Sequence, residues 1–256
     1  MPESKPSRRR AGVLLPRLFI MALAVAQPLP ALAQHDASGT QKETTVLRWW
    51  HGAAFVGGLS ALMLLDHPAQ RYLQGHRSAS ANEVSGSIRR FGQIEVYGTV
   101  TAGILAAGLV SGNADLTRTG GRLAATLALA GASASLGKLV LGRPRPNESL
   151  DADGYSPFSG QVAMPSGHTA MAFALATTLA DEIDRTWVSV GLYTTATAVG
   201  WSRMNDDSHW LTDVAAGAVL GITSSKLVSG RWRIFGIRPP KVLLGPTTGI
   251  AWQVAF

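Results

Sequence analysis

The sequence predicts an all-α protein, a bundle of six helices in one domain, from three observations. Hydrophobic residues make up 46% of the 256 residues and charged residues only 15%, below the roughly 25% of ordinary soluble domains. Six apolar stretches are each long enough for a helix. Polar segments with glycine and proline separate them, and the chain contains no sequence repeat.

The N-terminal residues 1–33 have the layout of a secretory signal peptide. A basic start, "SRRR", an apolar run over Leu18–Ala26 and an "ALA" ending predict cleavage after Ala33. The alternative is an uncleaved anchor helix. Residues 34–45 are polar and expected to form a leader. Export would place the protein in the cell envelope, with any functional site facing the periplasm or the outside.

The helical domain is expected over residues 46–230. Its apolar stretches run approximately over 47–65, 94–111, 121–141, 167–181, 186–202 and 210–228. The polar segment after the first stretch has room for a short surface helix. Several prolines hold the segment between the third and fourth stretches out of helix. Residues 231–256 begin basic and end apolar, and we expect them to form a packed extension.

These helices fit either a soluble bundle or one seated in a membrane. A span needs about 20 mainly apolar residues, and four of the stretches approach that length but contain many small and polar residues. The fourth stretch is shorter, and the mean hydropathy is only +0.14. If the N-terminus is exported, six spans would put the basic tail outside, against the positive-inside rule. The sequence leaves membrane association open.

The net charge of +7 favours an anionic partner. The basic residues are scattered, so nucleic acid is not expected, whereas anionic lipid headgroups or a phosphate substrate fit the charge. The absence of cysteine excludes disulfides and thiolate metal sites. The carboxylates of Glu148, Asp151 and Asp153 are irregularly spaced, and no metal site is expected.

Basic residues, serines, histidines and an aspartate lie at the ends of four of the apolar stretches. The third ends in "GKLVLGRPRP", the fourth starts at "PSGH", the fifth ends in "GWSRMNDD" and the sixth starts in "SHWLTDVAAG". If consecutive helices run antiparallel, these four ends lie on one face of the bundle. The candidate active site is therefore expected at the shared ends of the third to sixth helices.

The first part of this set is suited to binding a tetrahedral anion. Lys138, Arg145 and Arg203 supply three cations, and guanidinium groups bind phosphate oxygens in pairs. Ser166 offers a hydroxyl. The backbone N–H groups at Gly167 and its neighbours begin a helix, where free donors and the helix dipole favour anions.

The second part is suited to nucleophilic catalysis. His209 and Asp213 are four residues apart and share one helix face. A carboxylate that binds one ring nitrogen fixes the tautomer and leaves the other nitrogen free to attack. His168 would then donate a proton to the leaving oxygen. Phosphoryl transfer through a phosphohistidine requires these groups and no metal.

Three segments of this region resemble, in order, the motifs of the type 2 phosphatidic acid phosphatase (PAP2) superfamily. The matching positions are Lys138, Arg145 and Pro146 for KX6RP, Pro165 to His168 for PSGH, and Ser202, Arg203, His209 and Asp213 for SRX5HX3D. The ordered set is far more specific than one short motif. The resemblance covers roughly residues 120–228. It implies the helical fold shared with class A bacterial acid phosphatases and vanadium haloperoxidases.

The resemblance also implies a function and residue roles. It implies a metal-independent phosphatase without a cofactor that acts on phosphate monoesters or diphosphates, with lipid phosphates as the expected substrates. His209 would be the nucleophile held by Asp213, and His168 the acid. The phosphate-binding residues would be Lys138, Arg145, Ser166, Gly167 and Arg203.

Two alternatives remain at this point. One is a vanadate-dependent haloperoxidase, because the same pocket binds vanadate, although the short loop between Pro146 and Pro165 favours the phosphatase. The other is a non-catalytic envelope protein that binds anionic lipid. Outside the motif positions, we expect Arg143 to be a loop or headgroup contact, and Asp206 and Asp207 to be solvated loop carboxylates.

Overall fold

The computed structural model describes residues 44–235, 241–243 and 249–251. These residues belong to one unit of the chain, Thr40–Phe256. The predicted signal peptide, nearly all of the leader and much of the C-terminal extension lie outside the described residues, so the predictions made for them stay predictions.

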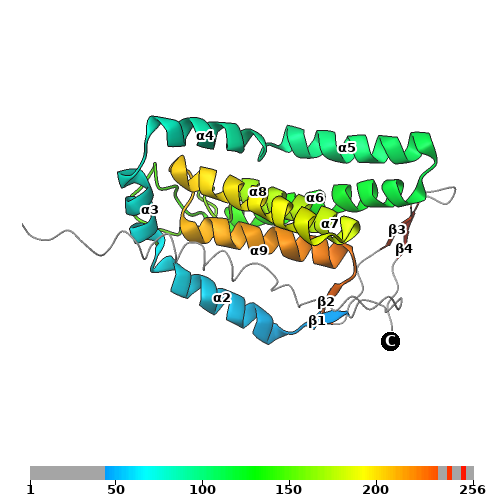
Figure 1. The fold of residues 1–256 in the computed structure, drawn as a ribbon. Helices are drawn as coiled ribbons and strands as arrows, with labels where there is room; N and C mark the ends of the chain where they lie inside the picture. The colour runs from blue at the N-terminus through cyan, green and yellow to red at the C-terminus, as the bar shows by residue number, and fades with distance from the viewer. Residues whose placement is uncertain (1–43, 236–240, 244–248, 252–256) are drawn as a thin grey trace, which may run out of the picture. The chain divides into compact units, whose positions relative to one another are not determined.

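The described residues are mainly helical (Figure 1). The helices are α2 (Trp49–Met63), α3 (Asp66–Gly75), α4 (Ala79–Arg90), α5 (Ile94–Ser111), α6 (Ala114–Leu141), α7 (Gly167–Ile183), α8 (Thr186–Asn205) and α9 (Leu211–Val228). The six predicted helices are present as α2 and α5 to α9, which confirms the all-α fold class. α6 begins earlier than predicted because the Asn113 side chain caps it, accepting hydrogen bonds from the backbone nitrogens of Asp115 and Leu116.

The polar segment after α2 forms two helices rather than one short surface helix. Ser78 caps the second of them, α4, by accepting a hydrogen bond from Ala81 N at 3.1 Å. Both helices bind the C-terminal end of α8. Gln74 of α3 donates to the Met204 carbonyl at 3.2 Å, and Ser85 of α4 donates to the Ser202 carbonyl at 3.1 Å. Polar faces are thus buried here through hydrogen bonds, which apolar periodicity does not reveal.

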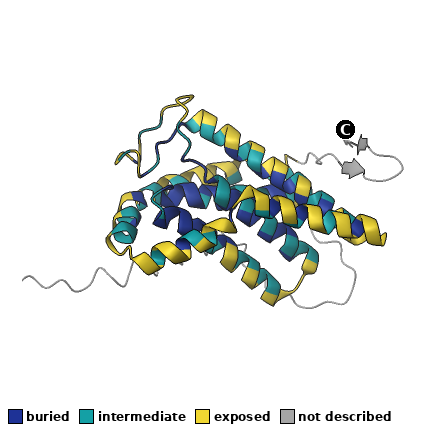
Figure 2. Cartoon of the chain, turned by 90° about the horizontal axis from the view of Figure 1, so that it is seen from above, coloured by how far each residue is buried: buried dark blue, intermediate teal, exposed yellow. Residues whose placement is uncertain are grey.

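The centre of the bundle is α7, which packs against α6, α8 and α9. Figure 2 shows the buried residues gathered in the middle of the bundle and the exposed ones on its outer faces. Gly221 of α9 lies so close to α7 that a Cβ there would be 2.2 Å from the Ala170 carbonyl oxygen. A Cβ at Gly217 would be 2.5 Å from the Ser166 carbonyl oxygen. These two glycines let the backbones of α7 and α9 approach closely where α7 begins.

Short strands flank the helices. β1 (Thr45–Leu47) pairs in parallel with β2 (Trp232–Ile234), so the start and the end of the helical region lie side by side. β3 (Lys241–Leu243) pairs antiparallel with β4 (Gly249–Ala251). β2, β3 and β4 all lie within the predicted C-terminal extension.

Among the residues that the structure describes, three helical segments are long and apolar enough to cross a membrane. They are Ala79–Ser111, which runs through the junction of α4 and α5, Ala114–Leu141 and Leu211–Val228. Only 17% of the apolar window of the first segment and 28% of that of the second are buried inside the protein, against 61% for the third. The outward faces carry apolar side chains such as Val110, which is 91% exposed. α5 and α6 therefore present apolar surface outward.

Gly221→Ala should destabilise the protein by about 1–3 kcal/mol, because the added methyl group would overpack the contact between α7 and α9. Gly191→Ala is the matched control, since a Cβ at this position in α8 would meet nothing within 4 Å. The control should be neutral or stabilising by up to about 1 kcal/mol. Chemical unfolding of both variants measures the difference, and equal midpoints would contradict the close packing described.

Candidate active site

The four helix ends that carry the predicted residues meet on one side of the bundle. The backbone N–H of Ser166, just before α7, donates to the carbonyl oxygen of Asp213 in α9 at 2.9 Å. Lys138, near the end of α6, reaches α7, because a Cβ on Gly167 would lie 3.6 Å from its Nζ. Asn147 N, in the loop after α6, donates to the Asp207 carbonyl after α8 at 3.1 Å. The structure thus brings the predicted residues together.

Ser166 occupies the N-cap position of α7, but its side chain makes no capping hydrogen bond. Its Oγ instead accepts a hydrogen bond from Thr169 Oγ1 at 2.9 Å, and the residue is fully buried. The first backbone N–H groups of an α-helix have no acceptor within the helix. At Gly167 and His168 these donors, together with the positive end of the helix dipole, create a site that favours an anion.

Arg145 and Arg203 each have a buried hydrogen-bond donor with no acceptor among the described residues. Nε of both side chains is buried and has no hydrogen-bond partner among them. Asp206 Oδ2 accepts from one terminal nitrogen of Arg203 at 3.0 Å and so fixes the orientation of this guanidinium. Buried donors normally find a partner, and a tetrahedral anion between the two guanidinium groups would supply one.

The imidazole of His209 is buried beside the carboxylate of Asp213. Nδ1 lies 3.6 Å from Asp213 Oδ2, which is longer than a hydrogen bond. The carboxylate itself is fixed, because Oδ2 accepts from the Trp210 backbone nitrogen at 2.8 Å and Oδ1 from Arg143 at 2.7 Å. Hydrogen bonds of this kind often shorten only when substrate binds. Nδ1 faces Asp213, so Nε2 is the ring nitrogen that is left to meet a bound anion.

His168 lies among cations that oppose its protonation. Burial lowers the pKa of His168 to about 4, and Arg203 adds to this effect, with smaller contributions from His209, Lys138 and Arg145. Burial likewise lowers the pKa of His209, although Asp213 opposes that shift. A phosphate dianion bound among the cations would raise the pKa of His168. His168 would therefore become a proton donor only with an anion in the site.

The low pKa of His168 makes a prediction about stability. Because a folded-state pKa of about 4 lies below the usual 6.5, the unfolded chain binds more protons between these values. The free energy of unfolding should therefore fall as the pH is lowered from about 6.5 to about 4. His168→Asn should reduce this dependence, which chemical unfolding at several pH values measures. Parallel curves for the variant and the parent protein would contradict the burial effect.

Arg143 is not the loop or headgroup contact that the sequence predicted. Its side chain is completely buried and forms ion pairs with Asp66 at 2.5 Å and with Asp213 at 2.7 Å. Nε donates to the Ala152 carbonyl at 2.8 Å. The prediction was wrong because Asp66 precedes Arg143 by 77 residues, and no local pattern in the sequence pairs the two.

Asp206 and Asp207 are not solvated loop carboxylates either. The side chain of Asp206 is 14% exposed and accepts hydrogen bonds from Arg89 and Arg203, each at 3.0 Å. Asp207 Oδ1 accepts from Gln70 at 3.0 Å. Asp206 provides the counter-charge for Arg203 and binds α4 to the end of α8, and Asp207 binds α3 there.

The junction between α4 and α5 covers one side of His168. A Cβ at Gly92 would lie 3.2 Å from Cδ2 of the His168 ring and 2.8 Å from Cγ1 of Val199. Gly92 therefore belongs to the wall of the candidate site, although the sequence offered no signal beyond a glycine between two apolar helices.

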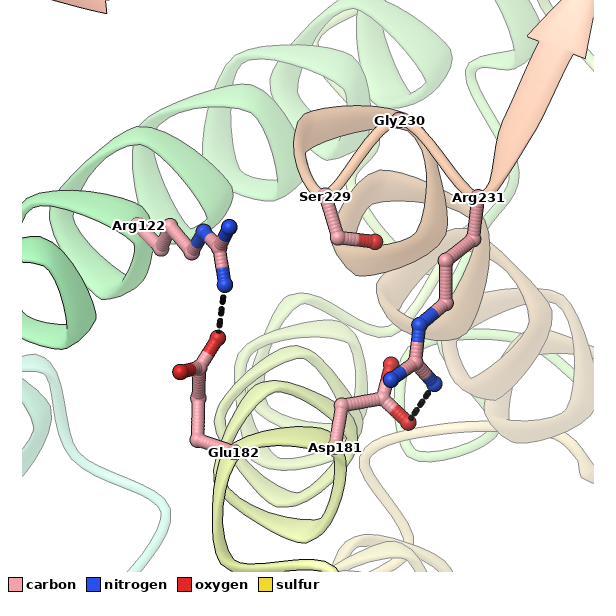
Figure 3. A pocket seen from close by; sticks show the side chains of 6 residues that line it. All are labelled: Arg122, Asp181, Glu182, Ser229, Gly230 and Arg231. Atoms are coloured by element: carbon pink, nitrogen blue, oxygen red, sulfur yellow. Dashed lines mark hydrogen bonds and ion pairs between the residues drawn. The ribbon is translucent and has the colours of Figure 1, made fainter. Parts of the chain in front are cut away.

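A polar cavity of about 290 Å³ lies at the C-terminal ends of α7 and α9, away from the candidate active site (Figure 3). In it, Arg122 forms an ion pair with Glu182, and Asp181 pairs with Arg231 at 2.6 Å. Lys226 also pairs with Asp181, at 2.8 Å. Each of these charges has a partner within the cluster, which joins α6, α7 and α9 and does not resemble the site at the other helix ends.

The fold and the site define a helical bundle with two histidines and three cations at shared helix ends. Residues 119–233 match the model of the PAP2 superfamily. This region contains all three motif segments and is a domain of the PAP2 superfamily.

A curated relative is the lipid A 1-phosphatase of Porphyromonas gingivalis. It is 40% identical over 108 residues, which are 41% of this chain and 22% of that protein. The chain thus matches only about a fifth of the length of this relative.

Two solved structures share the fold. The crystal structure of Aquifex aeolicus LpxE has a TM-score of 0.53 at 20% identity, over 64% of this chain and 94% of that one. The crystal structure of a transmembrane PAP2 type phosphatidylglycerolphosphate phosphatase from Bacillus subtilis has a TM-score of 0.50 at 20% identity, over 86% and 94%.

Proposed function

We propose that the protein is a phosphatase that hydrolyses phosphate monoesters or diphosphates, with lipid phosphates as its substrates. The observation that carries this proposal is the pair of buried, unpartnered Nε atoms of Arg145 and Arg203. Both belong to the motif residues that meet at the start of α7. The relatives support the substrate class, because their names describe a lipid A 1-phosphatase and a phosphatidylglycerolphosphate phosphatase.

The proposed reaction has two steps. In the first, Nε2 of His209 attacks phosphorus, the N–P bond forms, and the bond from phosphorus to the ester oxygen breaks. His168 gives its proton to the departing oxygen. In the second, His168 takes a proton from water, whose oxygen attacks phosphorus as the N–P bond breaks. Inorganic phosphate and a neutral His209 result, so the protein is regenerated.

The cations and the α7 N-terminus would stabilise the transition state. Phosphoryl transfer spreads charge over the three equatorial oxygens, and catalysis depends largely on donors placed to receive that charge. Lys138, Arg145 and Arg203 would supply the positive charge that a metal ion supplies in other phosphatases. We therefore expect activity in the presence of a chelator.

Membrane association completes the proposal. The apolar outer faces of α5 and α6 would lie in lipid, which brings a lipid substrate to the protein by lateral diffusion. The predicted signal peptide extends the proposal to an exported protein whose active site faces the periplasm or the outside.

His209→Ala should abolish turnover, because it removes the proposed nucleophile. We expect a fall in kcat of at least about a thousand-fold, in keeping with the loss of covalent nucleophiles elsewhere. The assay uses short-chain phosphatidic acid in detergent micelles and para-nitrophenyl phosphate, both with chelator. His76→Ala, at an exposed histidine of α3, is the matched control and should retain activity. Parent-like turnover by His209→Ala, or a need for added metal, would refute the mechanism.

A further inference from the structure

Three buried charges form a chain behind the candidate nucleophile. Asp66, at the start of α3, pairs with Arg143 at 2.5 Å, and Arg143 pairs with Asp213 at 2.7 Å. All three side chains are 0% exposed. Asp213 is the residue that faces His209. Asp66 lies outside the three motif segments, and the proposed two-step reaction does not use it.

The contacts of Asp66 fit a charged carboxylate. Oδ1 accepts from the Thr212 backbone nitrogen at 2.9 Å, and Oδ2 accepts from the Thr212 hydroxyl at 2.6 Å in addition to Arg143. Each of these partners is a donor, as an ionised carboxylate requires. Burial raises the pKa of Asp66, and the adjacent Arg143 and Thr212 oppose that rise.

Arg143 is held in a single position between the two carboxylates. One terminal nitrogen donates to Asp213 and to the Thr212 hydroxyl, the latter at 2.6 Å, and the other terminal nitrogen donates to Asp66. The rings of Tyr155 and Trp210 have their centroids 5.4 and 5.5 Å from its Cζ. Burial alone would lower the pKa of Arg143, but Asp213 and Asp66 together raise it. The guanidinium therefore stays charged.

The charges of Asp66, Arg143 and Asp213 add up to one negative charge. Arg143 offsets one carboxylate, and the second carboxylate stays uncompensated on the side that faces His209. Without the charge of Asp66, Arg143 would offset Asp213 itself. In a buried environment such a change acts strongly on a neighbouring imidazole, because water screens it little.

We propose that Asp66 is a positioning residue for the reaction: it pairs with Arg143 so that Asp213 is held in place and still presents its negative charge to His209. This inference rests on the proposed phosphatase function. It adds a residue from α3, outside the three motif segments, to the groups that control the nucleophile.

Several titratable groups face His209 and set the direction of the effect. They are Asp213 on α9, Arg203 on α8, Lys138 on α6 and His168 on α7. Asp213 alone among these four is negative, so weakening its field disfavours the protonated imidazole. The loss of the Asp66 charge should therefore lower the pH at which His209 becomes neutral.

Asp66→Asn tests the proposal, because it removes the charge and almost keeps the shape. With para-nitrophenyl phosphate we expect kcat to fall about ten- to a hundred-fold, the range found when groups behind a metal-binding histidine are replaced. KM should change by less than about three-fold. The acidic limb of the kcat/KM profile, which reports deprotonation of His209, should move to lower pH.

Asp181→Asn is the matched control. Asp181 is also an ion-paired carboxylate between helices, with Lys226 at 2.8 Å and Arg231 at 2.6 Å, but it lies at the opposite end of α7 (Figure 3). Its replacement should leave kcat and the pH profile unchanged, even where it lowers the unfolding midpoint.

A purely structural role for Asp66 predicts a different result. Asp66→Asn would then reduce the folded fraction and the apparent kcat together, with the acidic limb at the parent pH, and this outcome would overturn the proposal.

If Asp66→Asn does not fold, Thr212→Val tests the proposal instead. It removes only the hydroxyl shared by Asp66 and Arg143, and it should give a smaller shift of the limb in the same direction. A folded Thr212→Val protein with parent kcat and profile would also overturn the proposal.

The parent protein separates this proposal from the proposed function. If it hydrolyses neither para-nitrophenyl phosphate nor short-chain phosphatidic acid, the phosphatase function fails. If it does so and Asp66→Asn behaves like Asp181→Asn, only the role of Asp66 fails.

Discussion

The Asp213 carboxylate and its backbone connect the parts of the candidate site. The carboxylate accepts hydrogen bonds from Arg143, in the loop after α6, and from the backbone of Trp210 at the start of α9. The backbone carbonyl of the same residue accepts from Ser166 at the start of α7. One residue thus sets the positions of three helix ends, and His209 packs beside it. A change at Asp213 would alter both the proposed nucleophile and the proposed anion-binding end of α7.

The site concentrates positive charge in a buried environment, where a charged group is less stable than in water. Burial lowers the pKa of both histidines, and the neighbouring cations lower that of His168 further. The arrangement favours neutral imidazoles until an anion compensates the cations. In the proposed reaction, such a site would bind phosphate strongly and would protonate His168 at the stage at which a leaving group needs a proton. The close approach of α7 and α9 at Gly217 keeps these groups within reach of one another.

The sequence predicted the helices and the meeting of their ends, because long apolar stretches and antiparallel order are local properties. It did not predict the partners that arrive from α3 and α4. Asp66 and Arg143 are 77 residues apart, and Ser85 and Asp206 are 121 apart. A buried ion pair between distant segments depends on packing, and its residues look like surface residues in sequence. The predictions for Arg143, Asp206 and Asp207 were wrong because their partners lie far away in the sequence, whereas the match to the PAP2 superfamily was predictable from three short motifs in order.

The most direct test of the account is a structure of the protein with orthovanadate, a tetrahedral analogue of phosphate. The account predicts vanadium within bonding distance of His209 Nε2, with its oxygens accepting hydrogen bonds from Arg145, Arg203 and the first N–H groups of α7. Vanadate bound instead among Arg122 and Arg231 at the opposite ends of the helices, with the histidines unoccupied, would contradict it.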